Sequence, residues 1–132
     1  MELQASIDDL SRVSSSKTSY DKGFEAEDIV ASYYQKQNFI LISQRKKIAG
    51  VEVDLVFQHQ VTSEVLAVEV KSVTRGFENY LRLRPAQIRR LRRAFQVLVE
   101  NSAHPVEMKV VFVDLIRRRM RVSHFHHWNF ET

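Results

Sequence analysis

Two neighbouring apolar segments carry side chains that together could bind a divalent cation and hydrolyse a phosphodiester. Asp54 lies in VEVDLVF (51–57), and Glu69 and Lys71 lie one residue apart in EVLAVEVKSV (64–73). Carboxylates that are drawn together repel each other unless a cation neutralises them, and Mg²⁺ or Mn²⁺ accepts such hard oxygen ligands. A nearby lysine could orient the attacking water and stabilise the transition state. These residue types predict metal-dependent phosphodiester hydrolysis.

The Glu-x-Lys spacing by itself is a weak signal, because short motifs recur by chance. Glu107 and Lys109 have the same spacing in this chain. That second pair follows a predicted helix, whereas Glu69 and Lys71 follow a predicted strand that carries Asp54. The context therefore favours the first pair.

A further carboxylate, Glu27, falls within the core-facing stripe of a helix predicted from Tyr20 to about Gln37. The stripe contains Tyr20, Gly23, Phe24, Val30, Ala31 and Tyr34, which recur at helical spacing. A glutamate in such a stripe is unfavourable unless it is paired or binds a cation. It could meet an arginine at the edge of the core, or it could join Asp54 and Glu69 at a cation.

The elements that must position these residues follow the order α-β-β-β-α-β-β. After the first helix come strands at 39–43, 51–57 and 64–73, a helix from Pro85 to Asn101, and strands at 106–116 and 120–125. Strand alternation places Glu52, Asp54 and Val56 on one face, opposite Val51, Val53, Leu55 and Phe57. It places Val65, Ala67, Glu69 and Lys71 together on the next strand. A hairpin of these two strands would bring the charged faces together.

Composition predicts one soluble cytoplasmic domain. The chain has 132 residues, of which 44% are hydrophobic, and it contains no cysteine and no transmembrane run. Residues 1–19 are rich in serine and are predicted to be a flexible arm, with the folded domain at 20–132. No membrane partner is expected.

Clustered arginines favour a polyanionic partner more than the net charge of +4 does. One cluster precedes and occupies the second predicted helix, and another lies at 117–121. Solvated arginine faces are the alternative. The position of Arg84, Arg89, Arg90 and Arg93 just after the predicted active strand favours contact with phosphates.

The segments AEDIVASYY (26–34), VEVDLVF (51–57), AVEVKSV (67–73) and PAQIRRLRRA (85–94) resemble the YraN-like family. This family is a branch of the PD-(D/E)XK nuclease superfamily, related to Holliday junction resolvases. The resemblance runs from about Gly23 to Leu115. It implies an α/β, restriction-endonuclease-like fold, in which helices flank a central mixed β-sheet.

The resemblance also implies roles for individual residues. Asp54 and Glu69 would be the principal ligands of Mg²⁺ or Mn²⁺, the carbonyl of Val70 would complete the shell, and Lys71 would be the catalytic lysine. Glu27 would bind or orient metal and water. Gln87 stands where the family usually has lysine, and related nucleases use a glutamine on this helix to help the site or the substrate. Glu52 is either an accessory acid or a solvated edge residue.

The expected function is that of an endonuclease acting on DNA, with branched or single-stranded forms as candidate substrates. DNA is favoured over RNA, and the dimeric state of resolvases leaves a homodimer open. The alternative is a nucleic-acid-binding module that keeps the fold and does not cleave. A third interpretation, an acidic protein partner with structural ion pairs, is the least favoured.

Overall fold

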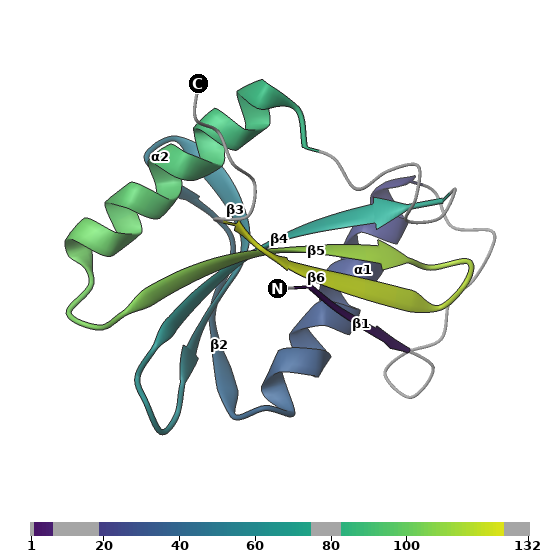
Figure 1. Cartoon of the computed structure of the whole chain (residues 1–132), viewed down its shortest axis with the longest axis horizontal. Helices are drawn as coiled ribbons and strands as arrows, with labels where there is room; N and C mark the ends of the chain where they lie inside the picture. The colour runs from purple at the N-terminus through teal and green to yellow at the C-terminus, as the bar shows by residue number, and fades with distance from the viewer. Residues whose placement is uncertain (1, 7–18, 75–82, 126–132) are drawn as a thin grey trace.

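The described part of the chain forms one mixed sheet with a helix packed on each face (Figure 1). The computed structural model describes residues 2–6, 19–74 and 83–125. Within them the elements are β1 (Glu2–Ser6), α1 (Ser19–Gln35), β2 (Phe39–Ile48), β3 (Val51–His59), β4 (Val65–Val73), α2 (Pro85–Asn101), β5 (Val106–Asp114) and β6 (Arg119–His124). The strand order across the sheet is β1-β6-β5-β4-β3-β2. Among the strands of these described residues, only β4 and β5 pair in parallel.

The predicted α-β-β-β-α-β-β order and the mixed sheet are confirmed. The predicted flexible arm is wrong for residues 2–6, because they form the edge strand β1, which pairs antiparallel with β6. The alternation of Leu3 and Ala5 with polar residues was too short to distinguish a strand from an arm. Residues 7–18 of the predicted arm lie outside the described residues.

The strand predicted at 39–43 is longer than expected, since β2 continues to Ile48. Ala49 and Gly50 both have positive φ, 53° and 76°, and they connect β2 to β3 where Ile48 pairs with Val51. Two such residues make the two-residue turn that suits the twist of a hairpin. The second half of β2 is polar because it lies at the edge of the sheet, which hid it from the hydrophobic pattern.

Two buried cores lie on opposite faces of the sheet. The core beneath α1 contains Ala26, Ile29 and Val30 together with Leu55 and Phe57 of β3 and residues of β4, β5 and β6. The core beneath α2 contains Leu91 and Ala94 with strand residues from the other face. Because both faces are covered, β4 and β5 are apolar on both sides, as parallel neighbours in a covered sheet usually are.

The predicted alternation along β4 is confirmed, but that along β3 is wrong. Val51, Val53 and Val56 pack beneath α2, whereas Leu55 and Phe57 pack beneath α1. A strictly alternating strand cannot place Val53 and Leu55 on opposite faces. The regular alternation of β3 is therefore broken at Asp54, the residue between them, and the side chains after it point to the opposite faces from those that alternation predicts.

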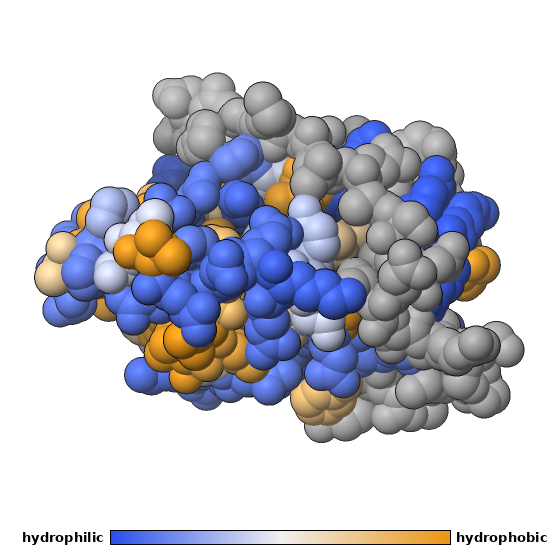
Figure 2. Space-filling view, turned by 90° about the horizontal axis from the view of Figure 1, so that it is seen from below, coloured by the Kyte–Doolittle hydropathy of each residue, from blue (hydrophilic) through white to orange (hydrophobic). Residues whose placement is uncertain are grey.

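The surface shown in Figure 2 is mainly hydrophilic and carries separate apolar groups. Large exposed apolar side chains among the described residues include Ile40 and Ile42 on β2 and Val61 between β3 and β4. Scattered apolar side chains are ordinary on a protein surface. Neither described helix has the length and apolar composition that a membrane crossing requires.

Candidate active site

The irregularity at Asp54 interrupts the sheet on both sides of β3. The β2–β3 register passes from Gln44–Leu55 to Lys46–Val53, so Arg45 and Asp54 are the residues left between these pairs. The β3–β4 register ends at Leu55–Val68, and continuing it would place Asp54 opposite Glu69. Arg45, Asp54 and Glu69 therefore occupy corresponding positions on three adjacent strands.

At this point the side chain of Asp54, rather than its backbone, forms the hydrogen bond to β4. Its Oδ2 accepts a hydrogen bond from the backbone N–H of Val70 on β4, with an N···O distance of 2.7 Å. This bond holds the carboxylate against the part of β4 that carries Glu69 and Lys71. The break in pairing thus creates room for polar side chains between two largely apolar cores.

Asp54 and Glu69 lie close enough to share a proton. Burial raises the pKa of Glu69 to about 8, and the charge of Asp54 adds to this rise. Burial also raises the pKa of Asp54, opposed first by the bond from the Val70 N–H. Two carboxylates in this arrangement favour one shared proton or one bound cation.

Three further observations describe the surroundings of Glu69. Its Oε2 accepts a hydrogen bond from Nε2 of Gln87 on α2 at 3.1 Å, and it lies 4.0 Å from Nζ of Lys71. Its Oε1 is buried and has no hydrogen-bond partner among the described residues. An orphaned carboxylate oxygen beside a second carboxylate is a donor set that suits Mg²⁺ or Mn²⁺.

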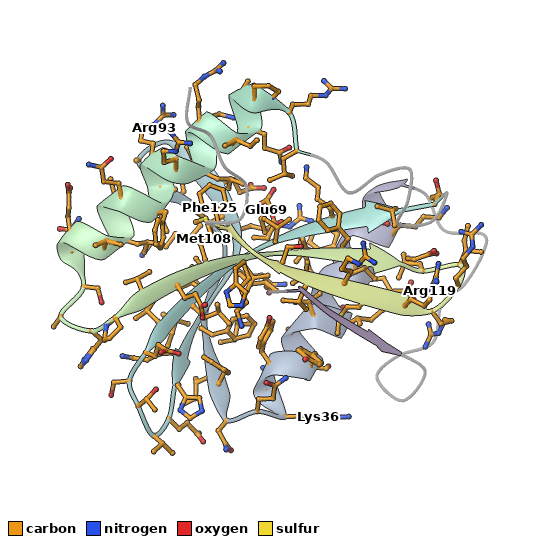
Figure 3. All side chains as sticks on the ribbon, in the orientation of Figure 1. Lys36, Glu69, Arg93, Met108, Arg119 and Phe125 are labelled. Atoms are coloured by element: carbon orange, nitrogen blue, oxygen red, sulfur yellow. The ribbon has the colours of Figure 1, made fainter. Side chains whose placement is uncertain are left out.

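A pocket of about 220 Å³ opens beside these groups, between α2 and the β2–β3 turn. Its lining consists of Gly50, Val51, Glu52, Glu69, Gln87, Arg90 and Leu91. Figure 3 shows Glu69 on the side of the sheet that faces α2, the helix that carries Arg93. Glu69 and Gln87 are thus reachable from outside through a hollow that also presents an arginine.

Glu27 is engaged on the α1 side by an arginine of β2. Nε of Arg45 donates to Oε1 of Glu27 at 3.1 Å, and Nη2 of Arg45 donates to Oε2 at 2.7 Å. Burial raises the pKa of Glu27 against the lowering effect of this pair, and the nearby charge of Asp54 raises it further. Of the two roles expected for Glu27, the structure displays the pairing with an arginine at the edge of the core.

The predicted nucleic-acid contacts lie on one exposed surface. Arg84 directly precedes α2, and Arg89, Arg90 and Arg93 are exposed on that helix. Nε of Arg93 donates to the carbonyl of Ala49 in the β2–β3 turn at 3.4 Å. Glu52 is exposed and lines the pocket, so it is at the rim of the site rather than between the two central carboxylates.

The structure therefore brings Asp54, Lys71 and Gln87 close to Glu69, and it pairs Glu27 with Arg45 near the same Asp54 carboxylate. Among residues 2–6, 19–74 and 83–125, no group of three or more acidic, histidine or cysteine side chains is arranged to hold a metal ion. Arg45 was missed by the sequence interpretation. The only sequence signal for it was the expectation that Glu27 could need an arginine.

The second Glu-x-Lys pair has a different environment. Oε1 of Glu107 lies 3.9 Å from Nζ of Lys109, much as in the first pair. However, Oε2 of Glu107 lies 2.7 Å from Nδ1 of His124 on β6, where the first pair has a neighbouring aspartate. Similar spacing on two adjacent strands thus yields a structural ion pair on the α1 face of the sheet and a carboxylate pair at Glu69, which bonds to α2.

Comparison with family models matches residues 26–123 to "Uncharacterised protein family UPF0102". The chain belongs to this family. The match confirms the YraN-like resemblance. The region matched to UPF0102 begins one residue before Glu27 and includes Arg45, Asp54, Glu69, Lys71 and Gln87.

Comparison with solved structures places this UPF0102 member beside a chain described as "crystal structure of a repair endonuclease from Pyrococcus abyssi". The TM-score is 0.47 and the sequence identity is 12%. The similarity covers 77% of this chain and 41% of that chain, so this chain spans less than half the length of its structural neighbour. No curated protein matches the sequence.

Proposed function

We propose that this protein is a metal-dependent endonuclease that hydrolyses phosphodiester bonds in DNA. The observation that carries the proposal is the Asp54–Glu69 pair, which is held in a break of the sheet and in which the buried Oε1 of Glu69 accepts no hydrogen bond from an N–H group of the described residues. Purely structural carboxylates normally have their oxygens satisfied. Branched and single-stranded DNA are the substrate forms to test first.

Each residue would act through its observed position. Asp54, Glu69 and the Val70 carbonyl would hold Mg²⁺ or Mn²⁺, while the Val70 N–H and Gln87 fix the two carboxylates. When bound, the cation would neutralise these carboxylates and offset charge that develops on the phosphate oxygens. Lys71 would orient the attacking water, and its ammonium would stabilise the transition state.

Lys71→Met tests the catalytic assignment. We expect cleavage of DNA to fall about 100-fold or more, because one preorganised charge at a transition state contributes on that scale. Methionine preserves the apolar stem of the side chain, so the fold should persist. The assay incubates flapped, four-way-junction and single-stranded DNA with the full chain in Mg²⁺, in Mn²⁺ and in EDTA.

The second Glu-x-Lys pair offers a matched control for this assay, Lys109→Met. That variant should cleave as the wild type does. Cleavage in EDTA, or equal cleavage by Lys71→Met and the wild type, would contradict the proposed function. A wild type that cleaves none of these substrates would favour the second candidate.

That second candidate is a module that binds nucleic acid without cleaving it, and the observation favouring it is the exposed arginine surface beside the pocket. Both candidates use this surface. They differ in whether binding requires the carboxylate pair, since a binding module should keep its affinity in EDTA.

Arg90→Gln tests whether that surface meets phosphates. We expect DNA affinity to fall about 3- to 10-fold at 0.1 M salt and the slope of log K against log salt to shrink by about 0.9, the value for one lost phosphate contact. Fluorescence anisotropy over a salt series measures both quantities. Lys36→Gln removes an equal charge from an exposed residue just beyond α1, on the opposite side of the molecule (Figure 3). If Arg90→Gln and Lys36→Gln give equal slopes of log K against log salt, the arginines of α2 face solvent and do not contact phosphates.

A further inference from the structure

Arg45 is held in one orientation by contacts on several sides. Its two bonds to Glu27 fix the plane of the guanidinium, and its Cζ lies 3.9 Å from the centre of the Phe24 ring. A planar pair of parallel bonds and a stacked aromatic ring both restrict a guanidinium more than a single contact would. The side chain of Arg45 is nevertheless 29% exposed, while that of Glu27 is 5% exposed.

The backbone of Arg45 is also unusual. Its φ of 53° lies in the left-handed region, although the residue is inside β2 and is not glycine. Such conformations are unfavourable and persist where the surrounding structure enforces them, which happens often at functional sites. Here the unusual residue lies directly across from Asp54, at the point where the β2–β3 register skips one pair.

The pairing leaves Glu27 unable to serve as a free ligand. Both of its carboxylate oxygens are bonded to Arg45, so a cation could reach them only by displacing the guanidinium. The guanidinium has five N–H donors, of which the pair uses two. Three N–H donors therefore remain on the partly exposed guanidinium. Arg45 is adjacent to Asp54, and the Asp54 carboxylate interacts electrostatically with it.

We propose that the acidic site takes a single divalent cation at Asp54 and Glu69, and that the guanidinium of Arg45 occupies the position of a second cation. This inference rests on the proposed function and refines it. Glu27 becomes the anchor that holds Arg45 in place rather than a metal ligand. Of the three remaining N–H groups, one on each terminal nitrogen would donate to a non-bridging phosphate oxygen, in the bidentate manner that suits arginine and phosphate.

Titration of the full chain with Mn²⁺, followed by calorimetry, tests the stoichiometry without relying on activity. We expect one equivalent in the wild type and two in Arg45→Gln, because removing the guanidinium frees Glu27 to bind a second, weaker cation. The double variant Arg45→Gln with Glu27→Gln should return to one. Lys47→Gln, which removes an exposed cation from the same strand, should also bind one.

Glu27→Gln keeps the experiment decisive if Arg45→Gln does not fold. The proposal expects this variant to retain its single equivalent of Mn²⁺. Two equivalents in the wild type, loss of Mn²⁺ binding in Glu27→Gln, or a single equivalent in a folded Arg45→Gln would each overturn it. Absence of Mn²⁺ binding by the wild type would instead overturn the proposed function, so the two failures are distinguishable.

Discussion

Asp54→Asn should abolish detectable Mn²⁺ binding and lower DNA cleavage at least about 1,000-fold, equivalent to about 4 kcal/mol of transition-state stabilisation. Asparagine has nearly the same shape as aspartate, and its amide oxygen can still accept the Val70 N–H that Asp54 now accepts at 2.7 Å. The variant therefore removes the negative charge while keeping the contact that holds β3 to β4. Its effect should appear in metal binding and catalysis more than in folding.

The measurements are calorimetric titration with Mn²⁺, cleavage of the DNA substrate that the wild type cuts fastest, and urea unfolding in EDTA. Glu107→Gln is the matched control, because it neutralises the carboxylate of the other Glu-x-Lys pair. It should bind Mn²⁺ and cleave as the wild type does. Cleavage by Asp54→Asn within a few-fold of the wild-type rate would remove this residue from the proposed catalytic site.

The order of the elements could be predicted because it depends on local patterns. Pro85 marks the start of α2, and the apolar period of that helix continues to Asn101, as the structure has it. The predicted end of the first helix near Gln37 is close to Gln35, where α1 ends, and Asn38 follows with a positive φ of 70°. These signals depend on short stretches of chain and require no knowledge of the neighbouring strands.

The site was only partly predictable, because its geometry depends on contacts between strands. The sequence singled out Asp54, Glu69 and Lys71 as one candidate cluster, and alternation along β4 correctly placed Glu69 on the face opposite Val68 and Val70. The change of face within β3 was invisible, since register is set by partners that the sequence does not specify. For the same reason, the sequence could suggest an arginine for Glu27 without identifying Arg45.

This irregularity explains why the carboxylate pair exists. Had β3 kept its ladder, a backbone bond would lie where the Asp54 carboxylate now meets the Val70 N–H. The interruption on the other side of β3 brings Arg45 beside the same carboxylate. One local disruption of regular pairing thus assembles charges of both signs at the centre of the sheet.

Without divalent cations, the free energy of unfolding should decrease as the pH rises from about 4.5 to 8. Burial and the neighbouring Asp54 raise the pKa of Glu69 from its ordinary 4.5 to about 8. Between these values the folded protein retains a proton that the unfolded chain has released, so the slope of the unfolding free energy against pH is negative. Glu69→Gln cannot ionise and keeps an oxygen for Gln87, so it should be more stable than the wild type at pH 8, on the order of 2 kcal/mol.

Urea unfolding in EDTA at pH 5, 6.5 and 8 measures this dependence. The difference between Glu69→Gln and the wild type should grow across the series, whereas Glu100→Gln at the exposed end of α2 should follow the wild type. Excess Mn²⁺ at pH 8 should stabilise the wild type, because a ligand that binds only the folded state raises its stability. The same addition should leave the stability of Glu69→Gln nearly unchanged. A pH-independent difference between the two proteins would show that Glu69 is already ionised in the cation-free fold. The carboxylate pair would then need no cation to offset its charge, and this outcome would contradict a metal site at Asp54 and Glu69.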